Sequence, residues 1–124
     1  MPTHISQPTA IEATSDKPRF VREFVGRINS AFNRLSIARM RSRPGWAEPG
    51  PTPDFDEYAL VLKSTLRVST KNQAVDVESG QAVFTHRGEW IQCSTPGVRD
   101  AEYIAVCLPA VSAETVHRSV EEAA

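Results

Sequence analysis

The sequence predicts an all-β protein, a small antiparallel barrel made by a single domain. Short segments rich in β-forming residues recur about every 8–12 residues, separated by Gly, Pro and Asn turns, a spacing typical of sandwiches and barrels. The 124 residues suit one domain with its own core. Two cysteines, Cys93 and Cys107, are too few for a disulfide scaffold or a four-cysteine zinc site.

The N-terminal half is expected to contribute an arm, two strands and a stiff loop. Residues 1–18 are rich in Ser, Thr and Pro and are predicted to be a flexible arm, which leaves 19–124 as the folded domain. Strands are expected at 20–25 and 35–41. In the second strand Arg39 lies on one face and Met40 on the other, and the alternation does not say which face is inward. Four prolines within 44–53 exclude a helix there.

Six further strands and one helix are predicted after the proline-rich loop. The strands are expected at 57–62, 65–69, 74–77, 81–85, 90–94 and 103–108. From Ser112 onward, Ala113, Val116 and Val120 have helical spacing, and Ser112 is suited to cap the first turn. We therefore expect a short C-terminal helix to follow the barrel.

The charge distribution limits the partners that the chain can have. The net charge is −1, but residues 1–45 carry +5 and the remainder −6. A near-neutral chain is not typical of a general nucleic-acid binder. No apolar run approaches the ~20 residues of a membrane span, and the N-terminus has no secretory pattern. We predict a cytoplasmic protein with no nucleic-acid or membrane partner.

Two segments resemble the two sequence motifs of the cupin superfamily. The first family pattern, G-x5-H-x-H-x3-E-x6-G, falls on Gly45, Pro51, Pro53, Glu57 and Ser64. The second, G-x5-P-x-G-x2-H-x3-N, falls on Gly80, His86, Gly88, Ile91 and Thr95. With the segment 105–109, which is similar to the last strand of small cupins, the resemblance covers about residues 30–110. It implies a jelly-roll barrel and a homodimer.

The departures from the two family motifs imply that the usual cupin metal is absent. Cupins commonly bind Mn, Fe, Ni or Zn through the two histidines and the glutamate of the first motif and the histidine of the second. Here Pro51, Pro53 and Ile91 stand at the histidine positions, and only Glu57 remains. One carboxylate does not hold a first-row divalent metal, which needs several converging ligands. We predict no metal and no other cofactor.

Glu57 is the candidate catalytic residue. The motif register points it into the barrel together with Ala59 and Val61. A carboxylate in an apolar interior has a raised pKa unless a cation or donors hold it, and such a group can act as a general acid or base near neutral pH. The alternative is that Glu57 only pairs with an arginine to close the barrel mouth.

Eight residues are candidates for the wall of a substrate site. Arg39 would clamp a substrate carboxylate if its strand face points inward, and would be a surface residue otherwise. Aromatic side chains in so small a barrel either wall a pocket or form its core. The eight candidates are Arg39, Met40, Trp46, Glu48, Pro53, Ile91, Cys93 and Tyr103.

Three functions are compatible with these residues. The first is a metal-independent enzyme, an isomerase, cyclase or lyase, in which Glu57 moves a proton on a small organic molecule. The second is a non-catalytic protein that binds a small molecule in the same cavity. The third is a metal-dependent, dioxygenase-like cupin with substitute ligands such as Glu48 and Cys93. The basic N-terminal segment and the acidic remainder suit a homodimer in each case, and the alternative is that they are solvated strand faces that carry arginine.

Overall fold

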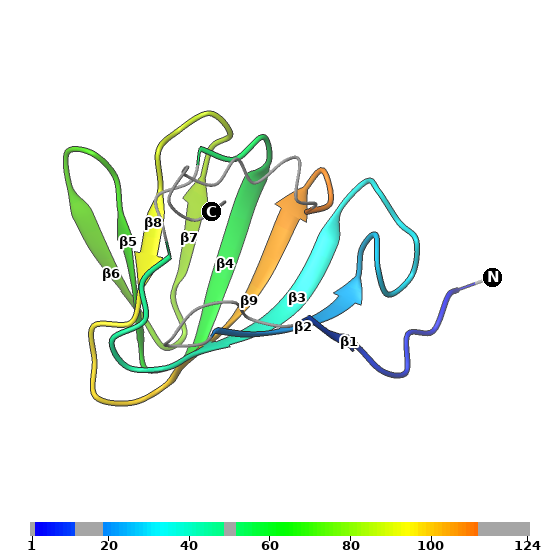
Figure 1. Ribbon diagram of the computed structural model, residues 1–124, viewed down its shortest axis with the longest axis horizontal. Helices are drawn as coiled ribbons and strands as arrows, with labels where there is room; N and C mark the ends of the chain where they lie inside the picture. The colour runs from blue at the N-terminus through cyan, green and yellow to red at the C-terminus, as the bar shows by residue number, and fades with distance from the viewer. Residues whose placement is uncertain (1, 12–18, 49–51, 112–124) are drawn as a thin grey trace, which may run out of the picture.

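The chain folds into two antiparallel sheets (Figure 1) in a computed structural model that describes residues 2–11, 19–48 and 52–111. The strands are β1 (Thr9–Ile11), β2 (Arg19–Val25), β3 (Ser36–Ser42), β4 (Asp56–Lys63), β5 (Thr65–Ser69), β6 (Ala74–Glu78), β7 (Ala82–Thr85), β8 (Gln92–Ser94) and β9 (Ala101–Leu108). The larger sheet has the order β1-β2-β3-β9-β4-β7 and the smaller one β6-β5-β8. The all-β prediction is confirmed. In the described part of the chain no helix is long and apolar enough to cross a membrane.

The structure describes part of the segment predicted as an N-terminal arm and none of the predicted C-terminal helix. Within the segment predicted as an arm, Thr9–Ile11 forms β1 and pairs with β2 at the edge of the larger sheet. The helix predicted from Ser112 lies outside the described residues.

The core lies between the two sheets, and strict alternation of side chains supplies it. Along β9, burial alternates at each of the eight positions, with the odd-numbered residues inward. The same period of two places one face of each strand in the interior. The buried apolar cluster draws on both sheets and consists of Trp46, Ala59, Val61, Leu66, Val68, Val77, Ile91, Cys93, Tyr103 and Ala105. Burying one large apolar side chain of this kind contributes about 1.5–3 kcal/mol.

Sharp turns stand where the motif glycines were identified. The φ angles are +81° at Gly45, +84° at Gly80 and +83° at Gly88, a region that side chains with a Cβ atom rarely adopt. Ser64, at the last glycine position of the first motif, also has a positive φ, +62°, between β4 and β5. The backbone therefore keeps the motif turn even where the glycine is replaced.

The loop after β3 is held against β8, which carries Trp46 and Glu48 to the barrel interior. The Thr95 N–H donates to the Trp46 carbonyl at 2.9 Å, and the Glu48 N–H donates to the Cys93 carbonyl at 3.0 Å. The Thr95 hydroxyl donates to the buried Ser42 hydroxyl at 2.7 Å. These bonds replace the regular ladder in a segment where prolines prevent one.

Candidate functional site

Five polar side chains meet on the inner face of the larger sheet, and we call them the interior polar group. They come from β2, from the loop after β3, from β4 and from β9. Among them are two carboxylates, one guanidinium, one phenol and one thiol. The members are Arg19, Glu48, Glu57, Tyr103 and Cys107.

Glu57 enters this group because β4 turns it inward with Ala59 and Val61. Its neighbour across the β4–β9 ladder is Cys107, whose Sγ donates to Glu57 Oε1 at 3.6 Å. Burial raises the pKa of Glu57 to about 7, and the Glu48 carboxylate contributes to the increase, while the Arg19 charge and the Cys107 thiol oppose it. Glu57 therefore exchanges a proton at neutral pH, which ordinary glutamates do not.

Arg19 supplies the positive charge of the group. Its guanidinium carbon lies 4.8 Å from the centre of the Trp46 ring, and its Nη1 donates to the Tyr103 hydroxyl at 3.5 Å. Burial by itself would lower the pKa of Arg19, but Tyr103 and Glu48 more than offset it, so the pKa lies above its usual value. Arg19 thus stays charged inside the barrel, and a cation over an indole ring is stabilised there.

Small residues of β3 give Arg19 the room to lie across the inner face. The Cα partner of Arg19 on β3 is Ser42, and the other fully inward positions of that strand are Ser36 and Ala38. A long side chain from β2 can extend over such short neighbours toward β9.

The two cysteines are protonated thiols under neutral conditions. Burial raises the pKa of Cys93, and the Glu48 and Glu57 carboxylates raise it further. Burial, followed by the Glu57 carboxylate, also raises the pKa of Cys107 well above its ordinary range. Because the thiolate is the reactive form, neither cysteine is suited to be a nucleophile. Cys93 has a positional role, since its backbone N–H donates to Glu48 Oε1 at 3.1 Å.

The structure brings several of the predicted wall residues to the interior polar group. Tyr103 and Glu48 belong to the group, and Trp46 lies under Arg19. Ile91 and Cys93 are in the adjoining apolar cluster, and the half-buried Met40 packs against it.

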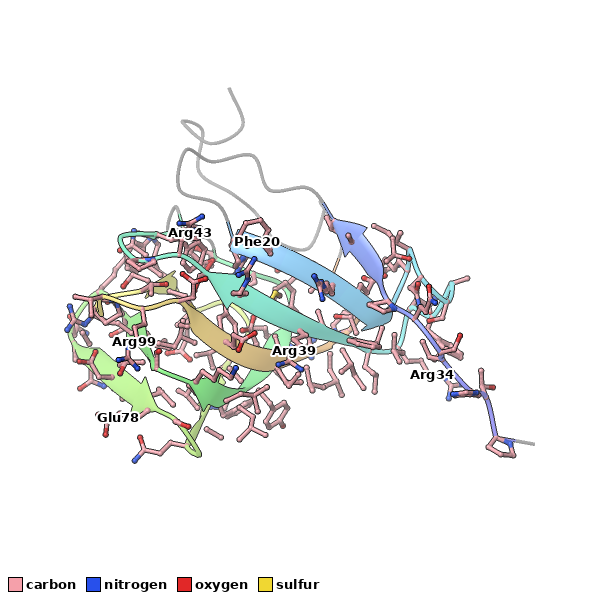
Figure 2. The ribbon with its side chains drawn as sticks, turned by 90° about the horizontal axis from the view of Figure 1, so that it is seen from below. Phe20, Arg34, Arg39, Arg43, Glu78 and Arg99 are labelled. Atoms are coloured by element: carbon pink, nitrogen blue, oxygen red, sulfur yellow. The ribbon has the colours of Figure 1, made fainter. Side chains whose placement is uncertain are left out.

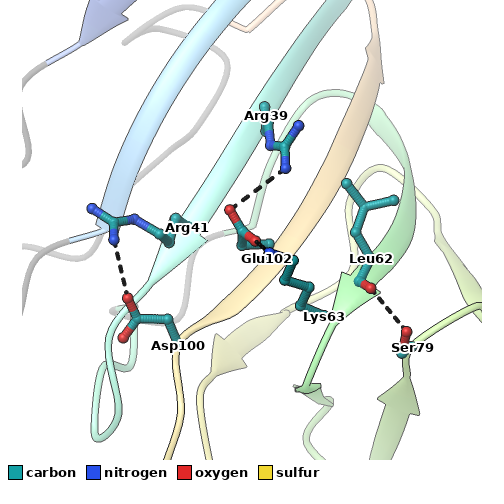
Figure 3. Close-up of polar contacts among 7 residues, drawn as sticks. All are labelled: Arg39, Arg41, Leu62, Lys63, Ser79, Asp100 and Glu102. Carbon is teal, nitrogen blue, oxygen red and sulfur yellow. Dashed lines mark hydrogen bonds and ion pairs between the residues drawn. The ribbon is translucent and has the colours of Figure 1, made fainter.

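Two predicted residues lie apart from the group. Arg39 projects from the outer face of β3 and forms an ion pair with Glu102 at 3.6 Å (Figures 2 and 3). Pro53 is buried in the loop before β4, where its carbonyl accepts the Gly88 N–H at 2.9 Å. The inward face of β3 is thus the one that carries Met40.

Two members of the interior polar group were not recognised from the sequence. Arg19 immediately precedes the strand predicted at 20–25, and only its alternation with Phe20 would have assigned it to the inward face. Cys107 was not among the candidate site residues. Its contact with Glu57 depends on the register between β4 and β9, and no local feature of the sequence specifies that register.

The residues at the family's metal positions do not fit a metal of that kind. Pro53 and Ile91 are buried and have no side-chain donor atom, and Pro51 lies outside the described residues. Within residues 2–11, 19–48 and 52–111, no three His, Cys, Asp or Glu side chains gather closely enough to share an ion.

Comparison with known proteins gives one sequence relative and several structural neighbours. No family model matches the chain. The chain is 31% identical over 102 residues to the endoribonuclease YbeY of Myxococcus xanthus, a match that includes 82% of the chain and 35% of that protein. The chain therefore spans about a third of the length of this relative.

Solved structures that are similar to this chain have low sequence identity to it. The Clostridium difficile EutQ protein has a TM-score of 0.62 at 23% identity, with 77% of this chain and 65% of that one covered. An ethanolamine utilization protein Q from Salmonella typhimurium has a TM-score of 0.61 at 16% identity, covering 85% and 98%. Oxalate decarboxylase of Bacillus subtilis has a TM-score of 0.74 at 17% identity, covering 96% of this chain and 34% of that one.

Proposed function

Because the chain has the fold of the cupin superfamily, we propose that it binds a small organic anion inside the barrel and transfers a proton to or from it through Glu57. The reaction class is that of a metal-independent isomerase, cyclase or lyase. The observation that carries the proposal is the presence of a cation, Arg19, and a carboxylate with a pKa of about 7, Glu57, in one buried group.

Glu57 has the protonation behaviour that general acid–base catalysis requires. A base works best when its pKa lies near the working pH, because it is then partly unprotonated and still basic enough to accept a proton. Burial beside Glu48 supplies that pKa here, as described above. The proton taken from a substrate carbon would reside on the Glu57 carboxylate and return to the product or to solvent from it.

Arg19 has the features of an anchor for a carboxylate. Among the described side chains its hydrogen-bond partner is Tyr103, at the long distance of 3.5 Å, and a ligand carboxylate would offer it shorter, charge-assisted bonds. The Trp46 ring fixes the guanidinium plane from one side. A bidentate carboxylate on Arg19 would also place the negative charge of an enolate near a cation. The structural neighbour named oxalate decarboxylase acts, by its name, on a small carboxylate, which is consistent with such a ligand.

The chain spans 35% of the endoribonuclease from Myxococcus xanthus, so the activity in that name is not assigned to it.

A small 2-oxo acid tests both halves of the proposal. Pyruvate carries a carboxylate for Arg19 and methyl protons next to a carbonyl for Glu57. In D2O, the wild-type protein should bind pyruvate in calorimetry and speed the loss of its methyl proton signal in NMR, as each proton passes to Glu57 and a deuteron returns. Glu57→Gln should keep the binding and abolish the exchange.

Arg19→Gln should lose the binding itself, whereas Arg22→Gln is the matched control. Arg22 lies on the same strand and faces outward, so its replacement should leave binding and exchange unchanged. Binding of pyruvate and other 2-oxo acids without exchange in the wild type would favour the non-catalytic binding protein. Absence of binding for any small carboxylate, or equal loss with Arg22→Gln, would contradict the role of Arg19.

A further inference from the structure

Three arginines and a phenylalanine meet on the outer face of the larger sheet, where β2 pairs with β3. The register sets Arg22 opposite Arg39 and Phe20 opposite Arg41, so the four residues stand at the corners of a rectangle. All four belong to the exposed faces of their strands, on the side of the sheet away from the interior polar group. We call Arg22, Arg39 and Arg41 the outer arginine group.

This arrangement is unfavourable for the folded chain by itself. Like charges directly opposite each other on one face of a sheet destabilise a strand pair, and Arg22 and Arg39 are such a pair. Arg41 adds a third positive charge two residues from Arg39 on the same face. In the described part of the chain, none of the ion pairs includes Arg22. An anion bound among the three arginines would offset their repulsion.

A depression with a volume of about 300 Å³ lies over this part of the sheet, which is room for a small organic ligand. The residues that line it are Phe20, Arg22, Arg39, Met40, Arg41 and Glu102. Three of them are arginines and one is a glutamate, so the lining has a net charge of +2 and suits a dianion.

Two nearby carboxylates contact the outer arginine group without covering it. The Arg39 Nη2 lies 3.6 Å from Glu102 Oε1, and the Arg41 Nη1 lies 3.3 Å from Asp100 Oδ2 (Figure 3). Glu102 is shared with Lys63, whose Nζ lies 3.3 Å from its Oε2. The Arg39 and Arg41 side chains remain 44% and 46% exposed. Exposed ion pairs of this kind are weak, so a ligand with more negative charge can compete for both arginines.

We propose that the outer arginine group binds the phosphate group of a small phosphate monoester, whose organic part lies against the Phe20 ring. Such a phosphate has three terminal oxygens and about two negative charges at neutral pH, which matches three guanidinium forks and the net charge of the lining. A carboxylate would neutralise only half of that charge. Phe20 is 37% exposed, and its ring centre lies 4.5 Å from the Arg41 guanidinium carbon, so an apolar surface adjoins the cations.

Calorimetry of the full chain with three probes tests the class of ligand. Phenyl phosphate should bind, and phenyl sulfate, which has the same shape and a single charge, should bind at least tenfold more weakly. Inorganic phosphate should bind several-fold more weakly than phenyl phosphate, and Phe20→Ser should remove that difference. Equal affinity for phenyl phosphate and phenyl sulfate would contradict a dianion site. Equal affinity for phenyl phosphate and inorganic phosphate would contradict the role of Phe20.

Arg22→Gln tests where the phosphate binds. It should weaken the binding of phenyl phosphate at least tenfold, while pyruvate binding at the interior polar group stays unchanged. Arg22→Lys keeps the charge but loses the planar fork, so its affinity should fall between the two. Arg34→Gln is the matched control and should bind like the wild type, because Arg34 is exposed in the loop before β3, away from the group (Figure 2).

The stability of Arg22→Gln without ligand gives a second readout. In urea titrations it should be at least as stable as the wild type, because the charge opposite Arg39 is gone. Phenyl phosphate should then stabilise the wild type and not the variant. No binding of phenyl phosphate to the wild type at millimolar concentrations, or the same affinity in Arg22→Gln, would overturn the proposal. A clear loss of stability in Arg22→Gln would mean that Arg22 has a structural role instead.

Discussion

The thiol of Cys107 donates to the carboxylate of Glu57 over 3.6 Å inside the barrel, from the neighbouring strand of the same sheet. The two groups differ in what they do at neutral pH. Burial and the Glu57 charge hold the pKa of Cys107 above its normal range, so the thiol keeps its proton, whereas the pKa of Glu57 is about 7. The pair therefore has one exchangeable proton near pH 7, and it resides on the carboxylate.

Replacing Glu57 by Gln should change how stability depends on pH. The folded-state pKa of about 7 lies above the ordinary 4.5, so between these values the native state holds a proton that the unfolded chain has released. Wild-type stability should fall as pH rises through this window, by about 3 kcal/mol. Glu57→Gln should be more stable than wild type at pH 8 and similar to it at pH 4. Urea titrations at each pH measure this. The exposed Glu78→Gln should follow the wild-type curve, and a wild-type slope in Glu57→Gln would contradict the assignment.

Substitutions at Cys107 should move the pKa of Glu57 in opposite directions. Cys107→Ala removes a donor that favours the ionised carboxylate, so the pKa of Glu57 should rise. Cys107→Ser puts a stronger hydroxyl donor in the same place, so the pKa should fall below the wild-type value. Carbon-13 NMR of the glutamate carboxyl carbons reads both shifts. If the two variants shift the signal in the same direction, the contact with Glu57 does not govern its titration.

Both cysteines should be unreactive in the folded protein. Cys93 and Cys107 are buried and their pKa values are raised, so an aromatic disulfide reagent at pH 8 should label neither of them within minutes. In denaturant both should be labelled at once. A cysteine introduced at exposed Ser79 serves as the positive control. Rapid labelling of the native wild type would mean that one thiol is accessible and ionised.

Thr95→Val should destabilise the protein through Ser42. The variant keeps the shape of the side chain but removes the 2.7 Å hydrogen bond between two buried hydroxyls. Leaving Ser42 without its partner costs about 1–3 kcal/mol. The double variant Ser42→Ala with Thr95→Val should recover much of that loss, because no buried hydroxyl is then left unpaired. Two losses that simply add in denaturant titrations would contradict this coupling.

Ser64→Gly should stabilise the protein, unlike most glycine substitutions. Ser64 has a φ of +62°, which costs a residue with a Cβ atom about 1 kcal/mol relative to glycine. The greater freedom of glycine in the unfolded chain offsets part of the gain, so we expect a net increase of about 0.5 kcal/mol. Ser69→Gly, within β5, should lower stability instead. Chemical denaturation of both variants distinguishes the two cases.

The strands after the proline loop could be predicted from the sequence because each has its own turn signals and β-forming residues. The segment 65–69 agrees with β5 at both ends, and 74–77 falls one residue short of β6. The edge strand β1 was missed because Thr9–Ile11 is three residues long and depends on pairing with β2. Short edge strands carry almost no pattern of their own.

The site was predicted only in part, because the sequence shows the alternation of a strand but not which of its faces is buried. The motif spacing located Glu57, since its inward position follows from the strand period once the register is known. The choice between the two faces of β3 depends on what packs against each face, and a period of two does not contain that information. Arg39 therefore stayed a candidate, while Arg19, on the inward face of the neighbouring strand, is the arginine that belongs to the interior polar group.

Two members of the interior polar group, Glu57 and Arg19, lie on strands whose backbone is paired to different extents. Glu57 on β4 is paired on both sides, with Cys107 of β9 and Thr85 of β7. Arg19 on β2 pairs with Ser42 of β3, and β1 pairs with β2 only at residues 21–23. Backbone that is paired on one side opens locally at a lower free energy than backbone paired on both sides, so amide hydrogen exchange should be faster beside Arg19 than beside Glu57. Under the proposed function, local opening at the Arg19 end would let a bound anion leave while Glu57 and the core stay in place.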